Sequence, residues 1–155
     1  MSDFTHFDQN GKAVMVDIGG KAITPREACA EGFVELNTEC AQLIKSGGFK
    51  KGDVLSIAQL AGIIGAKKTS DIIPLCHPLM LSSVQVSLTL EPKRVKVIAV
   101  TKTSGQTGVE MEALTAVCVA CLTVYDMCKA VQKDMRITGI RLLYKEGGKS
   151  GTYKT

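Results

Sequence analysis

The feature that most constrains the fold is a change in hydrophobic period near residue 84. Apolar and polar side chains alternate along 84–90, where the apolar set is Val84, Val86, Leu88 and Leu90. A period of two indicates a strand with one buried face. Glu91-Pro92-Lys93-Arg94 follows as a turn, and 95–103 is rich in β-branched residues, so we expect an antiparallel hairpin.

Three helices are predicted around this hairpin. The first is expected from about 25 to 46, because Thr24-Pro25-Arg26-Glu27 has the pattern of a capping box and Gly47-Gly48 supplies a left-handed stop. The second is expected to be capped by Asp53 and to end before Pro74. The third runs from about 109 to 132. Its middle is apolar on nearly all sides, which predicts burial on two sides, against its own sheet and against another subunit.

The last strand changes phase at Gly139, with Ile137 before it and Ile140 after it, which indicates a β-bulge. A short strand is expected at 13–17. The order of strand, two helices, hairpin, helix and strand excludes regular βαβ alternation. We therefore predict an α+β fold with a mainly antiparallel sheet packed against helices, in a single domain over 1–155 whose basic tail is flexible from about residue 146.

Composition narrows the class of protein. A net charge of +4 and seven aromatic residues, with no stacking motif or long basic stripe, disfavour a nucleic-acid partner. The longest uncharged stretch, 113–125, is shorter than the roughly 18 residues of a membrane span, and no signal peptide is readable. The six cysteines lie mostly in apolar helical patterns, so we expect them to be reduced and the protein to be cytoplasmic.

His77 is the first candidate site residue, since it stands in Pro74-Leu75-Cys76-His77-Pro78. Prolines on both sides restrict the backbone, and a stiff loop loses less entropy when a ligand binds. A histidine that is merely satisfied in the core or on the surface explains the pattern equally well.

The third predicted helix carries its charges only at its ends. Asp126, Lys129 and Lys133 form one stripe after the apolar run, and a lysine beside an aspartate can be tuned for proton transfer. Favourable interaction of terminal charges with the helix dipole is the plainer explanation. The loops at 105–108 and at Lys51 precede helices and could offer backbone N–H groups to an anion, which favours a phosphorylated small molecule as ligand.

Two other motifs are weaker. Cys118-x-x-Cys121 has zinc-ligand spacing, but it falls in the middle of an apolar helix, where packing explains both thiols better, and we expect no metal site. Gly147-Gly148-Lys149-Ser150 lacks the earlier glycine and the following helix of a phosphate-binding P-loop.

Several longer strings resemble a known family. These are Pro74-Leu-Cys-His-Pro-Leu-Met80, Thr107-Gly-Val-Glu-Met-Glu-Ala-Leu-Thr115 and Val124-Tyr-Asp-Met-Cys-Lys-Ala-Val-Gln-Lys-Asp134. The chain is similar throughout to the molybdenum cofactor biosynthesis protein C family of cyclic pyranopterin monophosphate synthases. The resemblance implies a ferredoxin-like subunit, a homohexamer of three dimers with the site at the dimer interface, and conversion of 3′,8-cyclo-7,8-dihydroguanosine 5′-triphosphate into cyclic pyranopterin monophosphate with release of pyrophosphate.

The resemblance also implies roles for individual residues. Asp126, Lys51 and Lys129 match the catalytic positions, and the substrate contacts implied are Leu75, Cys76, His77, Met111, Glu112, Lys145 and Lys149. Gln106 stands where some relatives are expected to carry a basic residue. No tightly bound cofactor is expected, although Mg²⁺ can accompany the substrate polyphosphate. The alternative is a pterin- or nucleotide-binding subunit without chemistry.

Helix geometry adds one expectation about assembly. Glu112 and Lys129 are 17 positions apart, so their Cα atoms lie roughly 25 Å apart on one helix. One substrate could hardly touch both. If both belong to one site, each has to come from a different subunit.

Overall fold

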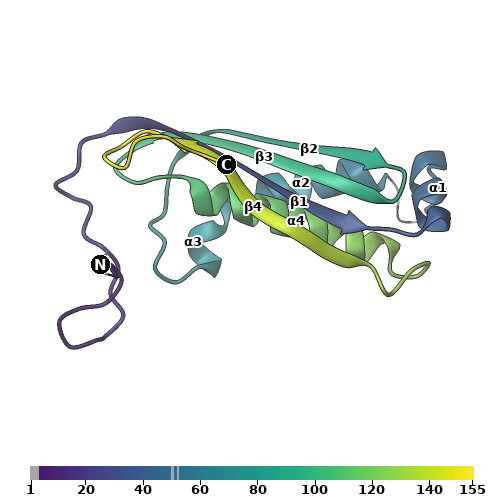
Figure 1. The fold of residues 1–155 in the computed structure, drawn as a ribbon, viewed down its shortest axis with the longest axis horizontal. Helices are drawn as coiled ribbons and strands as arrows, with labels where there is room; N and C mark the ends of the chain where they lie inside the picture. The colour runs from purple at the N-terminus through teal and green to yellow at the C-terminus, as the bar shows by residue number, and fades with distance from the viewer. Residues whose placement is uncertain (1–3, 50, 52) are drawn as a thin grey trace.

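The computed structural model describes residues 4–49, 51 and 53–155. Its elements are β1 (Thr24–Glu35), α1 (Thr38–Ser46), α2 (Val54–Lys67), α3 (Thr69–Ile72), β2 (Leu81–Glu91), β3 (Arg94–Gly105), α4 (Glu110–Cys128), β4 (Arg136–Glu146) and β5 (Tyr153–Lys154). The strands form one antiparallel sheet in the order β2-β3-β1-β4-β5 (Figure 1). Without β5, this βαββαβ order with β1 and β3 at the centre is the ferredoxin-like arrangement, as expected.

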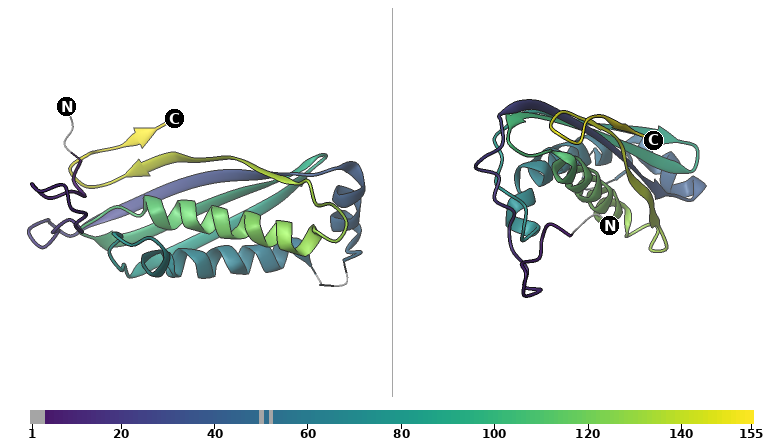
Figure 2. Two further views of the ribbon diagram at one scale, coloured as in Figure 1. Left: turned by 90° about the horizontal axis from the view of Figure 1, so that it is seen from below. Right: turned by 60° about the vertical axis from the view of Figure 1, so that its left-hand side comes forward.

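Helices α2 and α4 lie side by side on one face of the sheet (Figure 2, left). One side of α4 packs against β1 and β3, which confirms the prediction of burial against its own sheet. The other side packs against α2 of the same subunit, and contact with another subunit stays a prediction. The fully buried side chains include Val34, Val97, Val117 and Val124. By length and hydropathy α4 could cross a bilayer, but 56% of that stretch is buried within the subunit, as in a core helix.

The hairpin, the second helix and the bulge follow the sequence predictions. β2 and β3 pair from Leu81↔Thr103 to Glu91↔Arg94. The Asp53 carboxylate accepts from the backbone N–H of Leu55 and of Ser56 at the start of α2, at 3.0 and 3.2 Å. In β4, Gly139 has φ +61° at the point where the register with β1 shifts, so the predicted β-bulge is confirmed.

The predicted helix at 25–46 is wrong over its first half, because residues 24–35 form the central strand β1. The helix-facing positions of β1 are small or β-branched: Ala28, Ala30, Gly32 and Val34. On the other face, Glu31 pairs with Arg141 at 2.8 Å and with Lys96 at 3.9 Å. Cross-strand pairing therefore outweighs the local capping signal. The helix begins instead after Asn37, whose side chain accepts from the Cys40 N–H at 2.8 Å.

The predicted strand at 13–17 is also wrong. Ala13 forms only an isolated bridge with Phe7, and Asp17 uses its carboxylate to accept from the Gly19 N–H at 2.8 Å. Most of this segment is exposed and has no neighbouring strand in the described part of the chain. Beyond residue 146 the chain turns back, and β5 pairs with β4 through Tyr144↔Lys154; the flexibility of this tail stays a prediction.

Gly32 lies where β1 crosses α4, and this contact predicts a loss of stability on substitution. A Cβ atom at Gly32 would lie 2.6 Å from Val117 Cγ1 and 3.1 Å from Ile140 Cγ1. Gly32→Ala should therefore lower the free energy of unfolding by about 1–3 kcal/mol, as overpacking does elsewhere. Urea unfolding measures the change. Gly20→Ala is the control, since nothing lies within 4 Å of that position, and equal stability of the two variants would contradict the prediction.

Candidate active site

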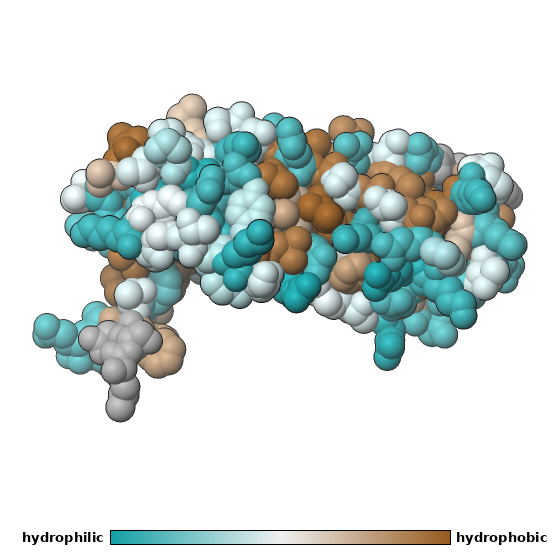
Figure 3. Space-filling view, turned by 45° about the horizontal axis from the view of Figure 1, so that its top comes forward, coloured by the Kyte–Doolittle hydropathy of each residue, from teal (hydrophilic) through white to brown (hydrophobic). Residues whose placement is uncertain are grey.

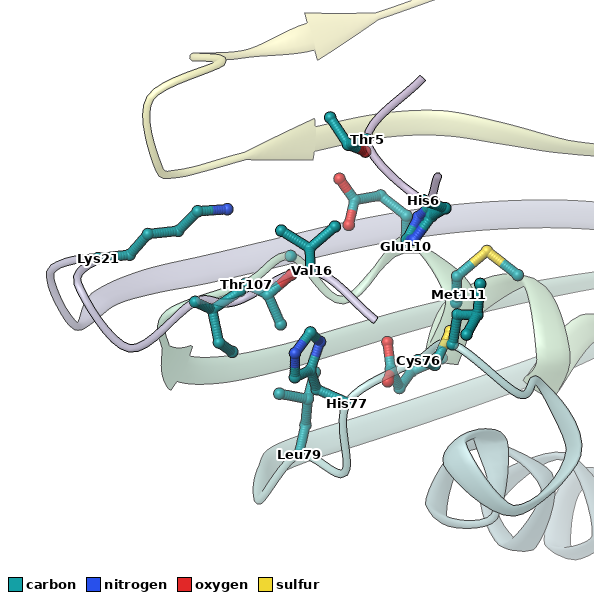
Figure 4. Close-up of a pocket in the computed structure, with 14 residues that line it drawn as sticks. Thr5, His6, Val16, Lys21, Cys76, His77, Leu79, Thr107, Glu110 and Met111 are labelled. Atoms are coloured by element: carbon teal, nitrogen blue, oxygen red, sulfur yellow. The ribbon is translucent and has the colours of Figure 1, made fainter. Parts of the chain in front are cut away.

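A cavity of about 270 Å³ lies at the N-terminal end of α4. Three segments far apart in the sequence form it: the N-terminal arm (residues 4–23), the proline-flanked loop (residues 74–78) and the start of α4 (Figure 4). All five predicted contacts from the loop and the helix line it, namely Leu75, Cys76, His77, Met111 and Glu112. The structure thus brings these sequence-predicted residues together.

Two buried threonines of β3 hold the walls of this cavity. The Thr101 hydroxyl donates to the carbonyl oxygen of Val109 at 3.0 Å, directly before α4. The Thr103 hydroxyl donates to the carbonyl oxygen of Met80 at 2.7 Å, just after the His77 loop. Because both anchors are on one strand, the loop and the helix start are fixed relative to each other.

Burial in the cavity wall changes the ionisation of Glu112. Glu112 is only 4% exposed, and burial raises its pKa to about 7, with a further contribution from the negative charge of Glu110. Burial likewise raises the pKa of the Cys76 thiol, and Glu112 adds to this effect. Glu112 can therefore gain or lose a proton near neutral pH, whereas Cys76 is a neutral contact surface.

The Glu112 pKa predicts a pH-dependent loss of stability. The pKa of Glu112 in the folded state lies above its ordinary value of 4.5. The stability cost of ionising Glu112 is therefore absent at low pH and complete once the pH exceeds about 7. Between about pH 4 and pH 8, the free energy of unfolding of the wild-type protein should fall by about 3 kcal/mol relative to that of Glu112→Gln, whose side chain does not ionise. Chemical unfolding at both pH values measures this. The exposed Glu39→Gln serves as control, and a constant difference between wild type and Glu112→Gln would contradict the prediction.

The two C-terminal lysines lie at the edge of this region. Lys145 Nζ is 2.9 Å from Glu110 Oε1 and donates to the Ser150 hydroxyl at 2.7 Å. Lys149 lines a second cavity of about 430 Å³ together with Lys21, Arg26 and Thr24. The Thr24 hydroxyl is buried and has no hydrogen-bond partner among the described residues. Both lysines thus lie near the first cavity without lining it.

A second group of predicted residues lies at the opposite end of α4. Lys129 Nζ is 2.7 Å from one carboxylate oxygen of Asp126, and Lys51 Nζ is 3.4 Å from the other. Lys51 also donates to the Asp126 carbonyl oxygen at 3.1 Å. The hydrogen bond and charge of Lys129, with help from Lys51, lower the pKa of Asp126, and Asp126 in turn raises the pKa of Lys129. At neutral pH this group therefore presents an ionised carboxylate beside cationic Lys129.

Within one subunit the structure does not bring the two groups together. Glu112 is in the first turn of α4, and Lys129 directly follows its last residue. Thr107 and Gly108, from the loop that the sequence marked for anion binding, also line this cavity, whereas sequence reasoning did not select Thr5, His6, Lys21 and Glu110. Three of these come from the arm, which has no hydrophobic period to place it against α4.

Cys118 and Cys121 of α4 pack against their neighbours and are not arranged as metal ligands. Cys121 is fully buried, and burial raises its pKa to about 12, while Cys118 is half-buried. Among the described residues, no three His, Cys, Asp or Glu side chains are arranged to hold a metal ion. We expect no stoichiometric zinc in the purified protein. Elemental analysis that found about one zinc per chain, lost in a Cys118→Ser, Cys121→Ser variant, would overturn this expectation.

Together, the fold and the two residue groups define an α+β subunit whose titratable side chains sit at both ends of one core helix. Comparison with known proteins identifies the family of this subunit. The sequence profile of the MoaC family matches residues 15–148, and the chain belongs to this family. It is 58% identical to the cyclic pyranopterin monophosphate synthases of Cereibacter sphaeroides strains KD131 and ATCC 17029, over 99% of this chain and 98% of each relative.

Proposed function

We propose that the protein is an enzyme of molybdenum cofactor biosynthesis that converts 3′,8-cyclo-7,8-dihydroguanosine 5′-triphosphate into cyclic pyranopterin monophosphate and pyrophosphate. Support comes from membership of the MoaC family and from 58% identity to synthases of that name over nearly the whole chain. The structural observation that carries the proposal is the cavity of His77, Met111 and Glu112 together with the Lys51, Asp126 and Lys129 group.

The chemistry requires proton transfers and then a phosphoryl transfer. While the purine-derived ring is opened and rebuilt, Glu112 suits both donation and acceptance of a proton because its pKa is about 7. In the phosphoryl step, a sugar hydroxyl oxygen bonds to the α-phosphorus, its proton passes to a base, and the bond to the β-phosphate oxygen breaks. A cationic Lys129 suits stabilisation of the charge on the departing pyrophosphate.

The remaining expectations about the site belong to the same proposal. Lys145 and Lys149 would hold the polyphosphate, and Mg²⁺ would accompany it as part of the substrate. Leu75 and Cys76 would contact the ring system, which suits their place in the cavity wall. A cytoplasmic location, without membrane or nucleic-acid partners, completes the proposal.

Assembly as a homohexamer of three dimers is proposed for two structural reasons. The first is the separation of the two residue groups along α4. The second is apolar surface that one subunit leaves uncovered: Leu60 and Ile64 of α2 are 62% and 59% exposed, and Leu122 of α4 is 58% exposed. Apolar side chains also gather over the middle of the sheet face that carries no helices (Figure 3). Light scattering should give six times the chain mass of 16.5 kDa.

The direct test is incubation with the cyclised nucleotide. We expect release of one pyrophosphate per product molecule, with the product identified by mass spectrometry. GTP is the matched control, because it has the same triphosphate without the cyclised ring. Binding of the cyclised nucleotide without pyrophosphate release would instead indicate a pterin- or nucleotide-binding subunit.

A further inference from the structure

The N-terminal arm, residues 4–23, leads into β1, and the side chain of Gln106 supplies its hydrogen bonds to the rest of the described chain. Gln106 Nε2 donates to the carbonyl oxygen of Gly19 at 3.2 Å and to that of Lys21 at 3.0 Å. Among the described residues, no other hydrogen bond or ion pair joins 4–23 to the remainder of the chain. The arm therefore takes its position from this amide group and from packing.

The segment that Gln106 holds is a compact turn. The Lys21 N–H donates to the Ile18 carbonyl oxygen at 3.0 Å, and the Gly19 N–H donates to the Asp17 carboxylate at 2.8 Å. Gln106 bridges two carbonyl groups of this turn, so it fixes both the position of the turn and its orientation. Its own loop continues into Thr107 and Gly108, which line the first cavity.

Because Gln106 holds the backbone carbonyl group of Lys21, the Lys21 side chain depends on this contact for its position. It lines both the His77 cavity and the cavity of Lys149 and Arg26. Figure 4 shows it extending from the loop before β1, while Thr107 projects from the loop before α4. A cation shared by two adjoining cavities is well placed for a negatively charged ligand that spans them.

We propose that Gln106 is a positioning residue that holds Lys21 at the junction of the two cavities for binding of the anionic substrate. The inference rests on the proposed function for its kinetic part only. The attachment of the arm by Gln106 can be tested whether or not the protein turns over the cyclised nucleotide.

The test uses three variants of the whole protein. Gln106→Glu keeps the size of the side chain but replaces the amide donor with an oxygen that repels both carbonyl groups. Gln106→Lys restores a donor at the end of a longer chain. Gln42→Glu makes the same chemical change at an exposed position of α1, remote from both cavities, and is the matched control.

Backbone amide exchange in residues 4–23 should become about tenfold faster in Gln106→Glu, stay unchanged in Gln42→Glu, and return toward the wild-type rate in Gln106→Lys. KM for the cyclised nucleotide should rise about tenfold in Gln106→Glu with kcat within about twofold, as for loss of one contact to a charged group. Unchanged exchange and KM in Gln106→Glu, or no recovery in Gln106→Lys, would overturn the proposal.

A double variant tests whether Gln106 acts through Lys21. If it does, Lys21→Ala combined with Gln106→Glu should have a KM no higher than the worse single variant. Multiplication of the two effects would contradict a shared route. If the wild-type protein shows no turnover, the proposed function fails, while the amide exchange result still decides the role of Gln106 in holding the arm.

Discussion

Asp126→Ala and Lys51→Ala proteins are expected to lose turnover while their thermal stability and oligomer size stay near wild type. Asp126 and Lys51 have side chains 58% and 50% exposed, so truncation removes little packing. Loss of a group that transfers a proton or stabilises charge lowers the rate by about 100-fold or more. A pyrophosphate assay together with thermal unfolding separates the two effects.

A second exposed lysine–aspartate pair provides a matched control. Lys68 and Asp71 form an exposed ion pair at 3.5 Å. Like Asp126 and Lys129, they are a lysine and an aspartate three positions apart in the sequence. Lys68→Ala and Asp71→Ala should keep wild-type turnover. Near-normal activity in a folded Asp126→Ala protein would remove the catalytic assignment of the Lys51, Asp126 and Lys129 group.

The second large effect is recovery of activity in mixed oligomers. Glu112→Ala and Lys129→Ala proteins, each inactive alone, should regain activity when they are unfolded together and reassembled. If each site takes one end of α4 from each of two subunits, a mixed dimer holds one site with both defects and one with neither. Random pairing makes half of the dimers mixed, so about a quarter of wild-type activity should return.

A mixture of Asp126→Ala and Lys129→Ala proteins, each expected to be inactive alone, is the control for this experiment. Both residues lie at the same end of α4, so every site in a mixed dimer keeps one defect and no activity should return. Verified Glu112→Ala and Lys129→Ala mixed oligomers that stay inactive would show that the two residues do not serve one site formed across two chains.

Much of the fold could be predicted because its signals are local. The alternation before Glu91 and the Asp53 cap each specify an element through neighbouring residues, and both are confirmed. The strand β1 could not be predicted in this way. Its pattern of small residues on one face and glutamates on the other has meaning only beside α4, Lys96 and Arg141. Pairing with residues distant in the sequence therefore determines that residues 24–35 form a strand.

The site shows the same division. The loop of His77 and the helix start at Glu112 carry recognisable motifs, and the structure places both in one cavity. The arm contributes His6 and Lys21 to that cavity without any period or motif of its own that predicts this. Two hydrogen bonds from Gln106, more than 80 positions away, hold the Lys21 end of the arm, and packing places the rest.

The position of α4 has a consequence for how the proposed sites can vary. One continuous helix carries a cavity residue at its first turn and a charged group at its last, so it acts as a fixed spacer between two reaction centres. A single residue inserted in its middle would rotate one end by about 100° and move it by about 1.5 Å relative to the other. Both centres of a dimer would then be misaligned at once. On the proposed assembly, the length of α4 therefore affects two sites at once, whereas each loop that flanks it affects one.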